Sequence, residues 1–212
     1  MTTQMLTIAV SKGYMLEKTI LLFNDIGLSF DVDLQTSRKL FSTDHINRVR
    51  LLQVRPWDVP VYVQGGAADL GIVGKDVLLE KDPPIAELLD LKFGRCDLVL
   101  AGMEQIEPNQ LAQNLTVATK YPRSTVNYFQ DRGLKIELIN LYGAIELAPM
   151  TGLADVICDL TATGKTLKEN NLKIIDTIFR SSARLVANPV SLKVHYDRIC
   201  AFSENLAKCC KE

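Results

Sequence analysis

The sequence predicts an α/β protein of two lobes, each a mainly parallel sheet flanked by helices. Short apolar runs alternate with amphipathic stretches along the chain, a pattern typical of strands joined by crossover helices. The length of 212 residues exceeds one small domain and falls short of two full-sized ones. Hydrophobic residues make up 47% of the chain, which is enough for a substantial core. We expect lobe I to comprise residues 1–94 and 180–212, and lobe II residues 95–179.

The first half of the chain shows the alternation most clearly. Strands are predicted over residues 6–10, 51–54 and 69–74, and helices over residues 16–26, 59–64 and 75–80. Gly65 and Gly66 follow the second of these helices as a stop signal. Each strand is therefore expected to lead into a helix, as a parallel sheet requires.

The second half repeats this rhythm with shorter helices. Strands are predicted over residues 98–101, 115–118, 136–139, 154–159, 174–179 and 183–187. Helices are predicted over residues 124–129 and 144–147, from the loop after the fourth strand to residue 170, and at the end of the tail 189–210. We expect Ser124 to cap the first of them, and Thr161 or Thr163 to cap the third.

Composition excludes several classes of function. The formal net charge is -1, so the chain lacks the basic excess typical of nucleic-acid binding. The apolar run near the N-terminus is too short for a signal peptide, and no stretch approaches the length of a membrane span. The five cysteines are odd in number and form no C-x-x-C pair, and only two histidines accompany them. These features predict a cytoplasmic protein with reduced thiols and without a zinc-type cluster.

The clearest chemical signal is the segment ELAPMTGLADVICDLTATGKTL, residues 146–167. A predicted strand ends in Asp159, and it is followed by a loop and a helix start formed by Thr161, Ala162, Thr163, Gly164, Lys165 and Thr166. Backbone N–H groups at a helix N-terminus and threonine hydroxyls are donors that suit a phosphate group. The segment therefore predicts a phosphate-binding loop.

This loop is not a nucleotide-binding P-loop, although Gly164, Lys165 and Thr166 resemble the end of that motif. The first glycine of the motif would fall at position 159, which is an aspartate. An aspartate before a phosphate loop suits a ribose 5-phosphate, because its carboxylate accepts hydrogen bonds from the 2- and 3-hydroxyls. A threonine-rich capped helix without a ligand is the alternative interpretation.

Eight residues of the segment match, spacing included, the signature of ATP phosphoribosyltransferase, the first enzyme of histidine biosynthesis: Glu146, Gly152, Ala154, Asp159, Thr163, Gly164, Thr166 and Leu167. Other segments resemble the family in the family's order, namely residues 11–13, 37–40, 55–60, 68–76 and 118–122. The resemblance covers nearly the whole chain. It implies a periplasmic-binding-protein-like phosphoribosyltransferase fold, and transfer of phosphoribosyl from phosphoribosyl pyrophosphate to N1 of ATP. It also implies Mg²⁺, carried with the pyrophosphate groups.

The resemblance further implies the roles of individual residues. Asp159 and Glu146 are expected near the ribose hydroxyls, and the loop from Thr161 to Thr166 around the 5-phosphate. Lys12 and Arg55 are expected to face the pyrophosphate and the ATP phosphates. These four side chains outside the loop form the expected catalytic set, and no protein ligands for a metal are implied.

The ATP site is expected to include Asp69, Leu70 and Arg38 on lobe I. For Asp69 the alternative is a turn residue at the end of a strand, and for any single cation it is a solvated surface charge. The family often carries an arginine where this chain has Tyr14. A tyrosine there loses one cation toward ATP and offers a ring for stacking on a base.

The end of the chain resembles the short form of the family. Long-form members carry an additional C-terminal regulatory domain, and this chain stops soon after the helix expected around residues 205–208. Short-form enzymes work with a separate regulatory subunit that resembles histidyl-tRNA synthetase. The resemblance therefore implies a hetero-oligomer, with a homodimer of the catalytic chain.

Two other functions share part of this pattern. A two-lobed solute-binding protein would have the same lobes, and the missing signal peptide and the loop after Asp159 count against it. Another phosphoribosyltransferase with a different base would share the loop, and the surrounding family segments count against that function.

Overall fold

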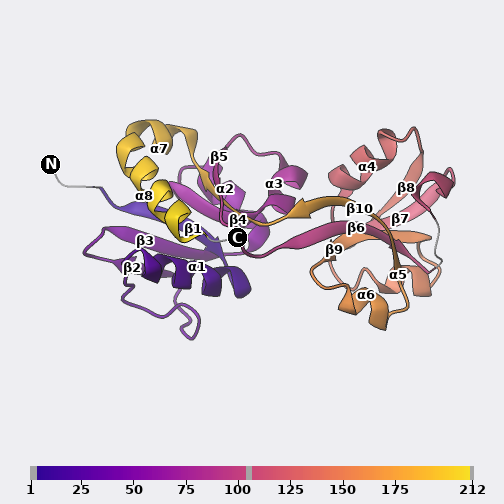
Figure 1. The fold of residues 1–212 in the computed structure, drawn as a ribbon, viewed down its shortest axis with the longest axis horizontal. Coiled ribbons are helices and arrows are strands. Elements are labelled where there is room, and N and C mark those ends of the chain that lie inside the picture. Colours follow the sequence, from indigo (N-terminus) through magenta and orange to yellow (C-terminus); the bar gives the residue numbers. More distant parts are fainter. Residues whose placement is uncertain (1–3, 104–106, 211–212) are drawn as a thin grey trace. The chain divides into compact units, whose positions relative to one another are not determined.

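The computed structural model describes residues 4–103 and 107–210 and contains two compact units. The first unit comprises Met1–Gly94 and Ser182–Glu212, and the second comprises Arg95–Ser181. Each unit holds one β-sheet with helices packed against it (Figure 1). The predicted α/β class with two sheets is confirmed, and each sheet is mixed, since it contains parallel and antiparallel pairs.

The first unit is built on a six-stranded sheet in the order β2-β3-β1-β4-β11-β5. Its strands are β1 (Leu6–Ser11), β2 (Phe41–Asp44), β3 (Val49–Val54), β4 (Leu70–Gly74), β5 (Ala86–Asp90) and β11 (Ala183–Ala187). β3, β1 and β4 run parallel, whereas β2 joins β3 and β11 joins β4 and β5 in antiparallel pairs. The carboxyl ends of the three parallel strands therefore meet at one edge, where α/β proteins bind ligands.

Helices cover both faces of this sheet. α1 (Tyr14–Asp25) and α8 (Tyr196–Cys209) pack against one face, where Phe23 and Ile8 belong to the same buried cluster. α2 (Val59–Gln64) and α3 (Lys75–Lys81) cover the other face, where Val59 packs with Ala9. Adjacent residues of β1 thus serve opposite faces, as the pleat of a strand dictates. α7 (Pro189–Val194) directly precedes α8, and a 3-10 turn at Pro56–Asp58 precedes α2.

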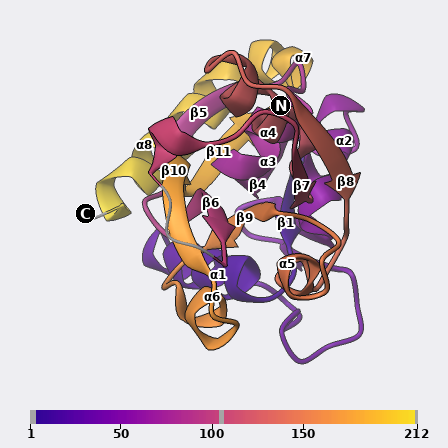
Figure 2. The same cartoon turned by 90° about the vertical axis from the view of Figure 1, so that its right-hand side faces the viewer.

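The second unit has a five-stranded sheet in the order β10-β6-β9-β7-β8. Its strands are β6 (Cys96–Gly102), β7 (Leu115–Thr119), β8 (Ile136–Asn140), β9 (Val156–Thr161) and β10 (Lys173–Ser181). β9, β7 and β8 run parallel, and β6 joins β9 and β10 in antiparallel pairs. α5 (Leu147–Met150) and α6 (Lys165–Glu169) lie on one side of this sheet and α4 (Pro122–Gln130) on the other (Figure 2).

Strands β2 and β5 of the first sheet are absent from the sequence prediction, and both pair antiparallel with their neighbours. In the second sheet β6 pairs antiparallel with β9 and β10, so both sheets are mixed. In β2 the buried side chains are polar, which hides the usual apolar pattern. Asp31 satisfies two of these groups, because its Oδ1 accepts hydrogen bonds from the Ser42 hydroxyl and the Thr43 amide, each at 2.8 Å. Buried polar groups tolerate a core position when they are paired in this way.

Helices α4 and α5 begin at positions other than those predicted. α4 begins at Pro122, with Tyr121 at the N-cap position, and Ser124 is buried inside the helix without capping it. Proline suits the first helical position because its missing N–H would have no partner there. α5 begins at Leu147, since Ala144 has a φ of 49° and cannot be part of a right-handed helix.

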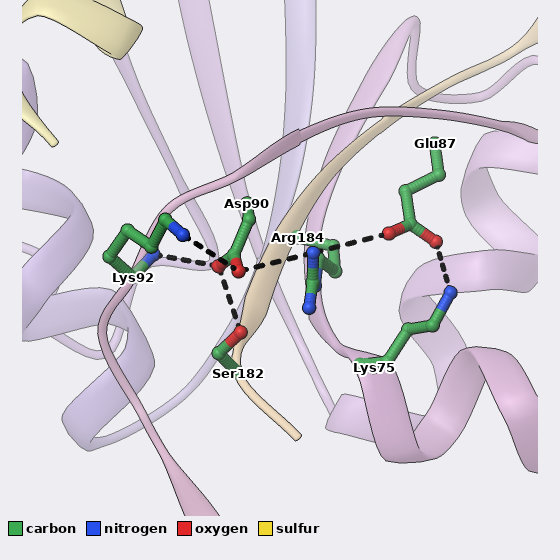
Figure 3. Close-up of polar contacts among 6 residues, drawn as sticks. All are labelled: Lys75, Glu87, Asp90, Lys92, Ser182 and Arg184. Atoms are coloured by element: carbon green, nitrogen blue, oxygen red, sulfur yellow. Dashed lines mark hydrogen bonds and ion pairs between the residues drawn. The ribbon is translucent and has the colours of Figure 1, made fainter. Parts of the chain in front are cut away.

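A network of charged side chains lies where the chain returns to the first unit (Figure 3). Nη1 of Arg184, on β11, lies 3.4 Å from Oε1 of Glu87 and 3.2 Å from Oδ2 of Asp90. Lys75 at the start of α3 donates to Glu87 at 2.6 Å, and the Ser182 hydroxyl donates to Asp90 at 2.8 Å. The network thereby joins β11, β5 and α3 beside residues 90–94 and 182, which lead to and from the second unit.

Every helix within residues 4–103 and 107–210 is too short or too polar to cross a lipid bilayer.

Candidate active site

The carboxyl ends of three parallel strands form the candidate site of the second unit. Thr119, the last residue of β7, pairs with Cys158 on β9 and with Asn140 on β8. Lys120, which follows Thr119, therefore leaves the sheet at this edge, whereas Asp159, which follows Cys158, still belongs to β9, a strand that continues to Thr161. Ligands of α/β proteins bind at this kind of edge.

The carboxylate of Asp159 lies at this edge, and nearby charges affect its pKa. Asp159 lies on β9 opposite Val99 of β6, two residues before the strand ends, and not at the strand end as predicted. Burial raises the pKa of Asp159 to about 6, and the negative charge of Glu146 adds to this effect. The amide of Leu160 and the positive charge of Lys120 act in the opposite direction. The structure thus brings together the two carboxylates that the sequence assigned to the ribose.

Glu146 reaches this edge from the segment between β8 and α5. It occupies the N-cap position of α5 and is half-buried. Its negative charge adds to burial in raising the pKa of Asp159, because a like charge nearby disfavours the ionised form. Such a pair suits neutral hydroxyl donors, which satisfy the oxygen lone pairs without adding charge.

The loop after β9 has the shape of a tight turn. The Thr161 hydroxyl accepts a hydrogen bond from the Gly164 amide at 2.8 Å, and the Thr163 hydroxyl lies 3.4 Å from the Lys165 amide. Gly164 has a φ of 70°, a left-handed conformation that favours glycine. Ala162, Thr163, Lys165 and Thr166 are exposed, so the loop presents its outer surface to solvent.

The capping prediction for this loop is wrong. Gly164, and neither Thr161 nor Thr163, occupies the N-cap position of α6, although the Thr163 hydroxyl accepts a long hydrogen bond from the amide of Lys165, the first residue of the helix. α6 has only five residues, so its dipole is small and the loop itself must supply most donors. Nζ of Lys165 lies 3.8 Å from Oε1 of Glu169, and because both side chains are exposed this ion pair is weak.

In the first unit, Lys12 and Arg55 lie at the carboxyl ends of neighbouring parallel strands. Ser11 pairs with Val54, and the two cations come directly after this pair. Both side chains are exposed. Arg38 is exposed in the segment before β2, whose first residue pairs with β3 near the same edge. The sequence-predicted cations of this unit therefore gather at one edge.

Asp69 and Leu70 lie elsewhere in the first unit. Asp69 precedes β4 at the amino end of the strand, opposite the edge of the two cations. Its carboxylate accepts hydrogen bonds from the Thr7 amide at 2.8 Å and the Ser191 hydroxyl at 2.7 Å. Leu70 has no exposed surface and belongs to the core. These contacts fit the strand-end role of the alternative interpretation, and the assignment of Asp69 and Leu70 to the ATP site stays a prediction.

Sequence reasoning missed Lys120 and Thr119, which lie at the second unit's site. Both fall in the segment 118–122 that resembles the family, and that segment was the available signal. Tyr14 at the start of α1 is 54% exposed, and Lys18 lies over its ring at 5.5 Å from the centroid. A cation thus accompanies the tyrosine that replaces the common arginine.

A separate hollow of about 410 Å³ lies at the opposite edge of the second sheet. Gly102, Leu115, Asp155 and Val156 are among its lining residues, and they mark the amino ends of β7 and β9. The Asp155 carboxylate accepts a hydrogen bond from the Thr116 amide at 2.8 Å. Its charge is therefore already engaged in fastening the two strands. In the described part of the chain, no group of three or more His, Cys, Asp or Glu side chains is arranged to hold a metal ion.

Comparison with known proteins identifies relatives of this chain. The profile of the HisG family, described as ATP phosphoribosyltransferase, matches residues 55–208. A protein of Geobacter sulfurreducens named ATP phosphoribosyltransferase 2 is 44% identical over 209 residues, with 97% of this chain and 99% of that protein covered. An ATP phosphoribosyltransferase of Caldanaerobacter subterraneus subsp. tengcongensis is 46% identical over 193 residues, with 91% of each chain covered.

Solved structures show the same relationship. A chain of the ATP phosphoribosyl transferase (HisG:HisZ) complex from Thermotoga maritima superposes with a TM-score of 0.82 at 36% identity, with 96% of this chain and 98% of that chain covered. The periplasmic aliphatic sulphonate binding protein SsuA from Escherichia coli superposes with a TM-score of 0.62 at 14% identity, with 98% and 72% covered. The second similarity is one of fold alone, and it confirms the predicted periplasmic-binding-protein-like fold.

The loop assignment predicts that Gly164→Val abolishes binding of ribose 5-phosphate, because a branched side chain forces the left-handed loop to rearrange. Gly133→Val is a matched control. Gly133 has a φ of 67° against 70° for Gly164, and at neither position would a Cβ atom meet another atom within 4 Å. Calorimetry should show lost affinity in the Gly164 variant alone. Equal affinity in both variants would remove the loop from the phosphate site.

The burial of Asp159 predicts that Asp159→Asn stabilises the protein at neutral and alkaline pH. Its folded pKa of about 6 lies above the ordinary 3.8, so the folded state loses stability as pH rises between these values. Asparagine avoids this cost, and we expect a gain of about 1–3 kcal/mol near pH 8 that shrinks toward pH 4. Urea unfolding at both pH values measures it, with Asp131→Asn at an exposed position as control. A destabilised Asp159→Asn protein at pH 8 would contradict the electrostatic assignment.

Proposed function

The chain belongs to the ATP phosphoribosyltransferase family, and from this premise we propose how its residues perform the reaction. The enzyme transfers the phosphoribosyl group of phosphoribosyl pyrophosphate to N1 of ATP and releases pyrophosphate, the first step of histidine biosynthesis. The observation that carries the residue assignment is the group formed by Asp159, Glu146 and the loop 161–166 at one sheet edge.

The proposed binding mode places the ribose over the two carboxylates and the 5-phosphate in the loop. Asp159 and Glu146 accept hydrogen bonds from the ribose hydroxyls. The exposed hydroxyls of Thr163 and Thr166 and the loop amides donate to the phosphate oxygens, with Lys165 as a nearby cation. Ala162 and Gly164 bring little side-chain bulk, so the backbone is open to the ligand.

Charge stabilisation is the proposed source of catalysis. Adenine N1 already carries a lone pair, so its attack needs no general base. Departure of pyrophosphate leaves positive charge on the sugar and adds negative charge to the leaving group. Asp159 in its partly desolvated position stabilises the first charge, because electrostatic interactions are stronger where water is excluded.

The leaving pyrophosphate and the ATP phosphates require cations. Lys12 and Arg55, exposed at the carboxyl edge of the first sheet, are the proposed donors, with Arg38 as a further contact for ATP. This assignment makes the first unit the nucleotide side of the enzyme and the second unit the phosphoribosyl side.

Metal ions are used in this family, and we propose Mg²⁺ as the ion. In this proposal the ion is carried with the pyrophosphate groups of the substrate, because Mg²⁺ binds substrate phosphates readily. No side chain of this chain is assigned as its ligand. The ion would neutralise charge on the pyrophosphate groups.

The partner is proposed from the Thermotoga maritima complex, whose title pairs HisG with HisZ. This chain covers 98% of the superposed chain of that complex. We propose that it assembles with a regulatory subunit of the same kind, resembling histidyl-tRNA synthetase, and that the catalytic chain forms a homodimer. The cytoplasmic location stays a prediction from the sequence.

A product assay tests the residue assignment. The purified chain with ATP, phosphoribosyl pyrophosphate and Mg²⁺, assayed with and without the regulatory subunit, should form phosphoribosyl-ATP and pyrophosphate. Asp159→Asn should turn over at least roughly tenfold more slowly, since its neutral amide cannot balance the charge on the sugar. Unchanged kinetics in this variant would make Asp159 a structural residue. Ligand binding without any pyrophosphate release would instead favour a solute-binding function.

Regulation gives a second test of the proposed function. The isolated chain should be active and little inhibited by histidine, and the regulatory subunit should restore strong inhibition. Inhibition at a distance needs a second site whose ligand favours one of two states, and we place that site on the partner. Histidine titration with and without the partner measures this. Potent, non-competitive inhibition of the chain alone would put a histidine site within these 212 residues.

A further inference from the structure

Lys120 lies at the candidate active site and has no role in the mechanism described above. It directly follows β7, and the pairing of Thr119 with Cys158 places it level with Asp159. Its positive charge lowers the pKa of Asp159 against the effect of burial. The lysine is therefore near enough to the carboxylate to affect its ionisation.

A buried hydroxyl network fixes the turn that carries Lys120. The Thr119 hydroxyl donates to the Cys158 carbonyl at 2.7 Å and accepts from the Tyr121 amide at 2.8 Å. The Thr125 hydroxyl donates to the Tyr121 carbonyl at 2.7 Å and lies 3.2 Å from the Thr119 hydroxyl. Thr119 and Thr125 have no exposed surface. The residues before and after Lys120, and the residue before Asp159, are thus held in one network.

The charges around Asp159 come from several elements. Glu146 reaches it from the start of α5 and has the same sign, whereas Lys120 has the opposite sign. On the adjacent strand β6, Asp97 lies opposite Thr161, which is two residues after Asp159 and therefore on the same face of β9. In the following helix, Lys165 pairs with Glu169. Lys120 is therefore the positive charge that opposes Glu146 at this carboxylate.

We infer that Lys120 is a positioning residue of the phosphoribosyl site, which the Thr119 network holds beside Asp159 so that this carboxylate stays ionised next to Glu146. The inference rests on the proposed function, because that function gives the negative charge of Asp159 its use. Without Lys120, Asp159 takes up a proton at higher pH, and the neutral acid no longer stabilises positive charge on the sugar.

The pH dependence of catalysis tests this inference. kcat/KM for phosphoribosyl pyrophosphate is measured from about pH 5 to about pH 9 for the wild type, Lys120→Met and Lys120→Arg. The pH at the midpoint of the acidic limb of kcat/KM should rise by about one unit in Lys120→Met, and it should return to the wild-type value in Lys120→Arg. Lys135→Met, an exposed lysine just before β8 at the opposite edge, should leave the limb in place. A loss in Lys120→Met that is equal at all pH values would overturn the inference.

A direct measurement separates this inference from the proposed function. The carboxyl carbon of Asp159 is followed by NMR in protein labelled with ¹³C-aspartate, and its signal is assigned by its loss in Asp159→Asn. The titration midpoint should be higher in Lys120→Met than in the wild type. An active wild type with unchanged midpoints overturns the role of Lys120 alone. A raised midpoint in Lys120→Met, found together with a wild type that forms no phosphoribosyl-ATP, supports the pairing of Lys120 with Asp159 and contradicts the proposed function.

Discussion

A carboxylate that is largely removed from water constrains the second unit. Asp159 occupies β9, a strand with neighbours on both sides, and burial there opposes its ionised form. Charged carboxylates avoid such positions unless compensating groups surround them. The amide of Leu160 and the charge of Lys120 supply part of that compensation, and Glu146 works against it. The ribose hydroxyls of the substrate would complete it, which couples the stability of the site to ligand binding.

The arrangement of strands explains why the functional residues lie where they do. In each unit the parallel strands end at one edge, where Lys12 and Arg55 lie in one unit and Lys120, Asp159 and the proposed phosphate loop lie in the other. The antiparallel strands β6, β10 and β11 instead carry the chain into and out of the second unit. The proposed chemistry therefore uses the parallel part of each sheet, and the antiparallel part connects the units.

Much of the fold was predictable from the sequence, because most strands are short apolar runs followed by helical spacing. β2 escaped prediction since Ser42, Thr43 and Asp44 are buried polar residues whose pairing with distant groups leaves no local pattern. The motif fixes the spacing of Asp159 and the loop, so their place near the carboxyl end of a parallel strand could be predicted, whereas their roles in binding stay predictions. The position of Asp69 at the amino end of β4 was not predicted, because a motif gives no information on whether a residue begins or ends a strand. Lys120 was missed because only the register of β7 with β9 reveals its neighbour.

The central claim is that the carboxyl edge of β7, β8 and β9 binds the phosphoribosyl group. Titration of the ¹⁵N-labelled protein with ribose 5-phosphate, followed residue by residue by NMR, measures this most directly. The account predicts that the amides of residues 120 and 159–166 shift together with one saturating affinity. Shifts that gather instead around Gly102 and Val156, at the hollow on the opposite edge of the sheet, would contradict it.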